Sequence, residues 1–131
     1  GMVYGLSHRY AWMPLAQVNP SPLWKWWDDF DIKKAEMLGY WMSGCPVKTS
    51  HPAIKATAYV HKGRRLAIAI ASWATETTAV KLEIDWKAVG LDPAKVRITA
   101  PEIAMFQSGM GSVSLEALPI EPAKGWIVVI E

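Results

Sequence analysis

Cysteine is almost absent from this sequence, since Cys45 is the one cysteine in 131 residues. A lone cysteine cannot form an internal disulfide and cannot build a cysteine-based zinc site. The three histidines, His8, His51 and His61, lack the spacing of a metal-binding pair on one helix. No acidic cluster stands beside them to complete a ligand set. We therefore expect no metal site and no other cofactor.

An excess of one charge and a long apolar run are also missing. Fourteen basic and twelve acidic residues give a net charge of +2, with a single basic cluster at residues 62–65. Nucleic-acid-binding domains carry a stronger basic face. No stretch approaches the roughly 18–20 apolar residues of a membrane span. We expect neither a nucleic acid nor a membrane as a partner.

The N-terminus lacks the basic region and apolar run of a signal peptide. Gly1 ahead of Met2 is typical of the residue left after a purification tag is removed, so the missing signal says nothing about a parent protein.

Paired catalytic carboxylates are not recognisable in the sequence. Hydrolysis of a glycosidic bond needs two carboxylates that face each other about 5–10 Å apart. Asp28 and Asp29 are adjacent, and neighbours in sequence point away from each other on a helix or strand. We assign no catalytic residue.

The second part of the chain has a strand pattern. Apolar residues alternate with polar ones from Ile54 onward, which is typical of strands with one buried face. Residues 65–73 are apolar on both faces and are therefore predicted to form a central strand. Other strands are expected at 54–60, 78–84, 96–100, 112–115 and 126–130, with a short helix at 86–89 capped by Asp85. This pattern predicts one mainly β domain, an antiparallel β-sandwich of Greek-key type, over residues 51–131.

Residues 1–50 have a different character and are predicted to be an irregular segment that packs on the sandwich. They contain five of the eight tryptophans. A short helix is expected from Pro22 to Phe30 with Ser21 as its cap, because apolar residues recur there at helical spacing. An entry strand is expected within residues 35–41.

The tryptophans are the most unusual feature of the composition. Trp73 and Trp126 lie on predicted strands and are expected in the core. Trp24, Trp26 and Trp27 are too crowded for a chain of this length to bury all of them. These three are candidates for contact with a neighbouring domain or with a glycan, since an indole suits both.

Several segments together resemble a known family. They are residues 22–28, 39–41, 67–73, 82–93, 99–103 and 125–130. They are similar to the C-terminal β-sandwich, and its junction with the preceding domain, of a group of bacterial glycoside hydrolases. In that group the sandwich follows a (β/α)₈ catalytic barrel, much as in the α-amylase superfamily.

The resemblance implies a non-catalytic accessory domain from a secreted or periplasmic enzyme. A barrel of about 250 residues does not fit in this chain, so no catalytic carboxylate is carried over. The implied partner is the catalytic barrel of a parent enzyme, or a second copy of the chain by self-association. Two alternatives stay open: a carbohydrate-binding module that holds polysaccharide through exposed tryptophans, and a stand-alone hydrolase.

Overall fold

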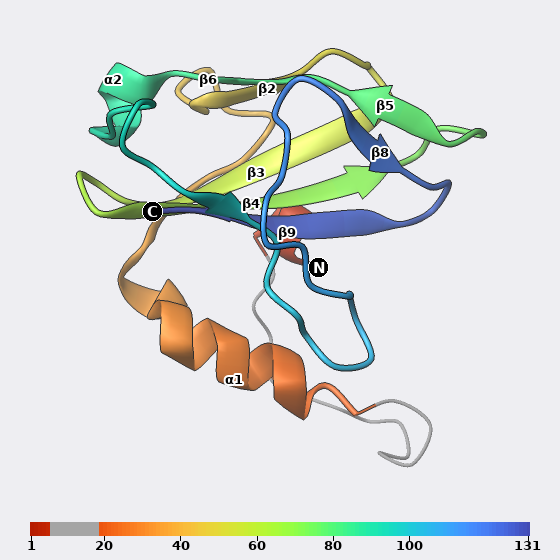
Figure 1. The fold of residues 1–131 in the computed structure, drawn as a ribbon, viewed down its shortest axis with the longest axis horizontal. Coiled ribbons are helices and arrows are strands. Elements are labelled where there is room, and N and C mark those ends of the chain that lie inside the picture. The colour runs from red at the N-terminus through yellow and green to blue at the C-terminus, as the bar shows by residue number, and fades with distance from the viewer. Residues whose placement is uncertain (6–18) are drawn as a thin grey trace.

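A computed structural model describes residues 1–5 and 19–131 (Figure 1). The helices among these residues are η1 (Met2–Tyr4), α1 (Ser21–Phe30), η2 (Ile32–Lys34) and α2 (Trp86–Val89). The strands are β1 (Glu36–Leu38), β2 (Val47–Thr49), β3 (Ile54–His61), β4 (Arg65–Ser72), β5 (Thr78–Val80), β6 (Leu82–Ile84), β7 (Ile98–Thr99), β8 (Leu118–Ile120) and β9 (Gly125–Ile130). None of the described helices has the length and apolar character needed to cross a membrane.

The main sheet has the strand order β1-β3-β4-β9-β7, and all of its pairs are antiparallel. Strands β3 and β4 form a hairpin whose turn contains Gly63 at a φ of 74°, a conformation that glycine adopts without strain. The side chains of β4 are buried on both faces of the sheet, with Leu66 and Ile68 on one side and Ala67 on the other. The predicted central position of this strand is confirmed.

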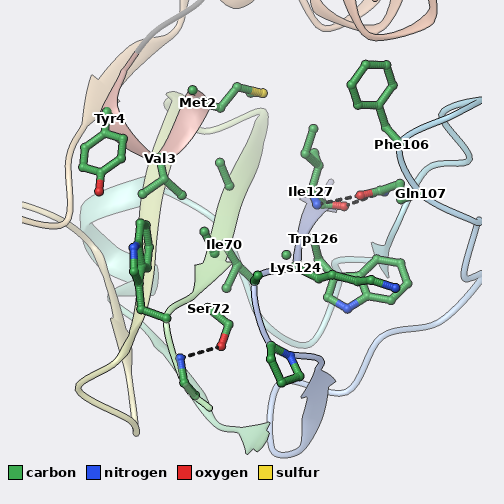
Figure 2. Close-up of a pocket in the computed structure, with 18 of the residues that line it drawn as sticks. Met2, Val3, Tyr4, Ile70, Ser72, Phe106, Gln107, Lys124, Trp126 and Ile127 are labelled. Carbon is green, nitrogen blue, oxygen red and sulfur yellow. Dashed lines mark hydrogen bonds between the residues drawn. The ribbon is translucent and has the colours of Figure 1, made fainter. Parts of the chain in front are cut away.

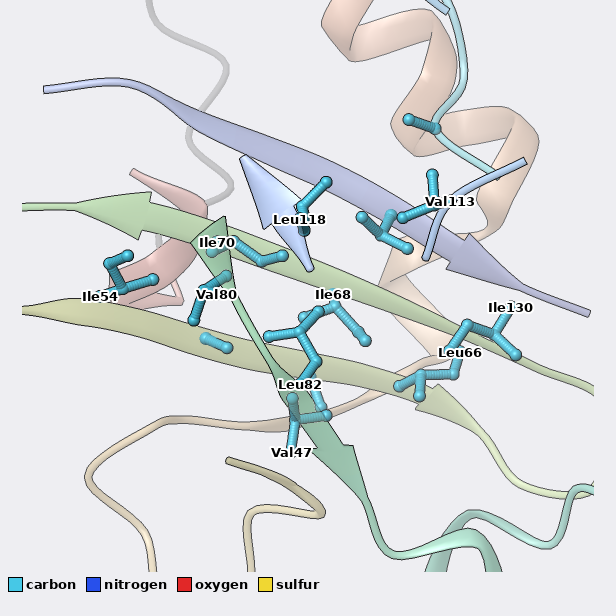
Figure 3. Packing of buried hydrophobic residues seen from close by; sticks show 14 of the residues in the cluster. Val47, Ile54, Leu66, Ile68, Ile70, Val80, Leu82, Val113, Leu118 and Ile130 are labelled. Carbon is cyan, nitrogen blue, oxygen red and sulfur yellow. The ribbon is translucent and has the colours of Figure 1, made fainter. Parts of the chain in front are cut away.

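A second layer covers one face of the main sheet. It consists of two short antiparallel ladders, β2-β6 and β5-β8. In Figure 3, Val80, Leu82 and Leu118 of this layer lie over Ile68 and Ile70 of β4. The main core lies between these two layers, and the mainly β, antiparallel sandwich predicted from the sequence is confirmed.

Two strand predictions in the second layer are wrong. Residues 78–84 form two strands rather than one, because the backbone at Lys81 is hydrogen-bonded to Ser50 and the ladder partner changes there. Both strands lie in the second layer and not beside β4. Residues 112–115 form no strand. A turn at Ser114, whose hydroxyl accepts from the Glu116 amide at 3.2 Å, interrupts pairing, and the strand begins at Leu118.

Smaller differences concern the ends of elements. Helix α1 begins at Ser21, so Ser21 is not its cap as predicted. The cap position is Pro20, whose carbonyl accepts from the Trp24 amide at 3.0 Å, and no side chain caps the helix. Strand β7 is shorter than the predicted 96–100. The short helix α2 is confirmed, with Asp85 accepting from the Ala88 amide at 3.0 Å. The entry strand is confirmed as β1.

The outer face of the main sheet carries α1 and η1 (Figure 1). Trp27 and Phe30 of α1 pack on Ala67 and Ala69 of β4, whose small side chains let the helix approach closely. Met2 packs in the same outer core. The division of the chain at residue 50 stays a prediction.

Hydrogen bonds hold the N-terminal residues on this outer face. The Thr57 hydroxyl donates to the carbonyl oxygen of Val3, and the Tyr59 hydroxyl donates to that of Met2 at 2.7 Å. Both hydroxyls come from β3. The first residues of the chain are therefore part of the folded body.

Alkaline pH is expected to weaken the fold through Tyr59. Burial raises the pKa of this phenol from 10.0 to about 12. In the unfolded chain it ionises near pH 10, whereas in the folded chain it stays neutral. The contribution of Tyr59 to the free energy of unfolding should therefore be constant below pH 10 and fall as pH rises from 10 to 12.

Urea unfolding of the wild type and of Tyr59→Phe across this pH range tests the expectation. The phenylalanine variant loses the hydrogen bond to Met2 and should be less stable by about 0.5–1.5 kcal/mol at neutral pH. The gap between the two proteins should shrink above pH 10. Stability curves that stay parallel up to pH 12 would contradict the role given to Tyr59.

Candidate functional site

A row of four aromatic side chains, three of them about half exposed, runs across one part of the surface, and we call it the aromatic strip. It comprises Tyr4, Tyr40, Trp41 and Trp73. The ring centroids of Trp73 and Tyr4 are 5.9 Å apart, those of Tyr4 and Tyr40 6.2 Å, and those of Tyr40 and Trp41 5.1 Å, each pair edge to face. Tyr4, Trp41 and Trp73 are 49%, 53% and 52% exposed. Each ring is in contact with another ring, so the strip is ordered although half of its surface faces outward.

Local backbone geometry places the ends of the strip. Trp41 lies over Gly39, where an added Cβ would be 2.6 Å from the indole, so any larger residue there would displace this ring. Trp73 directly follows the last residue of β4, and its amide donates to the Ala53 carbonyl at 2.8 Å. The prediction that Trp73 lies in the core is wrong, because the ladder ends at Ser72 and the next side chain leaves the sheet.

A groove of about 810 Å³ adjoins the strip on the outer face of the main sheet (Figure 2). Tyr4 lies on one side of it, and Phe106 and Trp126 lie on the other. Its floor is shallow because Ala71 and Gly125 present little or no side chain there. The groove is an uncovered part of the face that α1 occupies elsewhere.

A second cavity, of about 470 Å³, adjoins the groove, and we call it the Trp126 cavity. It shares Phe106, Gln107 and Lys124 with the groove. Its lining combines two aromatic rings with several polar side chains: Phe106, Trp126, Thr77, Ser108, Glu121 and Lys124. The two cavities differ in that a larger share of the residues lining the second have polar side chains.

Gln107 fixes the wall between these cavities. Its side-chain amide donates to the Ile127 carbonyl at 3.1 Å and accepts from the Ile127 amide at 2.8 Å, as the dashed lines in Figure 2 show. It also donates to the carbonyl of Pro101 at 2.6 Å. Strand β7 stops before Pro101, which has no N–H to offer a neighbouring strand. The Gln107 side chain takes that place beside β9 and so anchors the loop that carries Phe106 to the strand that carries Trp126.

The amino-acid sequence matches a known protein family over most of its length. The sequence model of the glycoside hydrolase 123, C-terminal domain, matches residues 19–131. The chain belongs to this family. Searches of curated proteins and of solved structures gave no match. The resemblance to a glycoside hydrolase C-terminal domain expected from the sequence is thereby confirmed.

The predicted site residues of this glycoside hydrolase 123 C-terminal domain all lie on α1. Trp27 is 4% exposed, and its indole N–H donates to the sulfur of Met2 at 3.1 Å. Trp26 is half-buried and stacks on Phe30 with 5.3 Å between centroids. Trp24 is also half-buried. Their role as an interface or a glycan surface stays a prediction.

The sequence reasoning missed the strip and both cavities. Nothing in the spacing of Tyr4, Tyr40 and Phe106 distinguishes them from core aromatics. The position of Trp73 outside the strand could have been inferred. A hairpin centred on Gly63 pairs Ile54 with Ser72, so the strand ends at Ser72 and not at residue 73 as predicted. Trp126 was expected in the core and is half-buried beside the cavities.

Six of the described acidic residues of the glycoside hydrolase 123 C-terminal domain form ion pairs at the surface: Asp29, Asp31, Asp92, Glu116, Glu121 and Glu131. Asp29 contacts Lys25 at 2.7 Å, and a hydrogen bond from Lys34 lowers the pKa of Asp31. No group of three His, Cys, Asp or Glu side chains in residues 1–5 and 19–131 is placed to hold a metal. His8 and Trp12 lie outside these residues. Of the described residues around the two cavities, Glu121 alone carries a carboxylate, so they do not supply the pair that glycoside hydrolysis needs.

Proposed function

We propose that this chain is a non-catalytic accessory domain that packs against the catalytic domain of its glycoside hydrolase. The observation that carries the proposal, beyond family membership, is the aromatic strip. Contiguous exposed apolar surface on a folded domain marks contact with another surface. Tyrosine and tryptophan are also enriched at protein interfaces. A barrel as the catalytic partner and a secreted or periplasmic location are parts of this proposal.

The strip is suited to docking because its rings are already positioned. Tyr4 contacts Trp73 on one side and Tyr40 on the other. The Lys55 ammonium lies 5.5 Å from the Tyr40 ring centroid and restrains that ring further. Side chains that are ordered before binding lose less conformational entropy in a complex. The strip therefore favours a lasting contact between two folded surfaces.

The alternative proposal is an autonomous module that binds polysaccharide through Trp24, Trp26 and Trp27. Because Trp27 is buried against Met2, a flat platform on α1 would have only the two half-buried indoles. Docking through the strip has the stronger support, since three of its four rings are about half exposed.

The docking proposal predicts that Trp41→Ser with Trp73→Ser weakens binding to the catalytic domain of a family 123 enzyme at least tenfold. Central aromatic residues of an interface each contribute about 2 kcal/mol or more. Titration calorimetry measures the affinity. Thermal unfolding of the double variant should stay cooperative, because both side chains are about half exposed and belong to neither buried core.

Met105→Ser is the matched control, because Met105 is 66% exposed and lies outside the strip. It should leave the affinity unchanged. Wild-type affinity in the double variant would refute docking through the strip. Dimerisation of the wild-type chain that the double variant abolishes would assign the strip to self-association instead.

A further inference from the structure

We propose that the Trp126 cavity binds a neutral pyranose unit of a saccharide. This site lies apart from the α1 tryptophans. The inference goes beyond the docking role and does not depend on it, because the cavity and the aromatic strip share no residue.

A fixed aromatic face is the first requirement of such a site. The Trp126 indole N–H donates to the Pro119 carbonyl at 3.1 Å, and its backbone lies in the β4-β9 ladder opposite Ile70. The ring therefore has a defined orientation in the absence of ligand. Phe106, 45% exposed, lines the same cavity. A pyranose has a C–H face that packs on such a ring, as other apolar groups do.

Polar groups around the rings supply the second requirement. The Lys124 ammonium and the Glu121 carboxylate form an exposed ion pair at 2.6 Å. An exposed pair of this kind contributes only about 0–1 kcal/mol, so it can open at little cost to bind a ligand. The exposed hydroxyls of Thr77 and Ser108 also line the cavity. Sugar hydroxyls both donate and accept, and they match this mixture of donors and acceptors.

The charge and size of the cavity select the ligand class. The described lining residues carry one positive and one negative side chain, so an anionic ligand that gains from Lys124 would be repelled by Glu121. A volume of about 470 Å³ lies within the range of roughly 300–1,000 Å³ found for small-molecule sites. A neutral sugar ring, flat on one face and hydroxylated at its edge, fits both constraints.

Gln107 is a positioning residue for the site. Its two hydrogen bonds to Ile127 hold the loop that carries Phe106 against the strand that carries Trp126. These contacts within the chain keep the two lining segments together in the absence of a ligand.

Titration of the chain with methyl glycosides of glucose, galactose and mannose tests the inference. Two-dimensional NMR follows the indole N–H signals. The Trp126 signal should shift with a dissociation constant on the order of 1 mM for at least one of these glycosides. Glucuronic acid should bind more weakly than the neutral sugars.

Phe106→Ala should raise the dissociation constant at least fivefold. Its neighbour Met105 does not line the cavity, so Met105→Ala is the matched control and should bind as the wild type does. Trp126→Ala removes more of the site but changes a strand residue, so its result counts only if its NMR spectrum shows that the variant is folded.

No shift of the Trp126 signal with any neutral glycoside, or equal binding by Phe106→Ala, would overturn the proposal. Tighter binding of glucuronic acid would overturn the choice of a neutral ligand. These outcomes are independent of the docking experiment: the Trp41 and Trp73 double variant can lose docking and still bind the glycosides as the wild type does.

Discussion

Replacing Ile68 by alanine is expected to lower the free energy of unfolding by about 2–5 kcal/mol. Ile68 lies in the middle of β4, opposite Ala58 of β3 and Val128 of β9. All three side chains are completely buried, and the second layer closes over them (Figure 3). Truncation removes apolar contacts and leaves a cavity that neighbouring strands cannot fill, because the hydrogen-bonded ladders hold them in register.

Urea unfolding followed by tryptophan fluorescence measures this loss. Ile84→Ala is the matched control, because Ile84 is half-buried at the end of β6 and should cost clearly less. Ile70→Ala should resemble Ile68→Ala. Losses below about 1 kcal/mol at both Ile68 and Ile70 would contradict the central place given to β4.

Gly125→Ala is expected to destabilise the fold by about 3 kcal/mol or more, at or above the upper end of the usual cost of overpacking. A Cβ on Gly125 would overlap the carbonyl oxygen of Ile70 and lie 2.9 Å from its carbonyl carbon. The obstructing atoms are backbone of the central strand, so no side chain can rotate away to make room. The start of β9 would have to separate from β4.

Gly111→Ala provides the matched comparison for this change. No atom lies within 4 Å of a Cβ added there, and no positive φ requires a glycine. That variant should be neutral or more stable by about 0.4–1 kcal/mol, since alanine restricts the unfolded chain. Equal stabilities of the two variants in thermal unfolding would show that the β4-β9 contact at Gly125 is looser than described.

The long strands could be predicted from the sequence because burial leaves a regular pattern in them. Alternation in residues 54–60 and apolar residues on both faces of 65–72 identify β3 and β4. The short strands are different, since two or three residues carry too little pattern. Whether β5 and β6 are one strand or two depends on Ser50, which is about thirty residues away in sequence, and local periodicity cannot reveal such a partner.

The candidate site was harder to predict than the fold, because an exposed aromatic ring and a buried one look alike in sequence. Trp27 and Trp41 are both tryptophans of the first fifty residues, yet one lies under Met2 and the other faces outward. The difference comes from tertiary packing on α1 and from the space above Gly39. Family membership could be inferred because it rests on segments spread along the chain.

The side-chain amide of Gln107 also covers part of an open strand edge, at which another molecule could pair. Strand β7 pairs with only the last part of β9, opposite Val129 and Ile130. An N–H and a C=O of β9 left open beyond that point would be a template for a strand from another molecule. Gln107 satisfies both groups at Ile127 from within the same chain, and it does so with a side chain that cannot propagate a ladder. One glutamine thus occupies the position on β9 where a strand of another molecule could continue the β7 pairing.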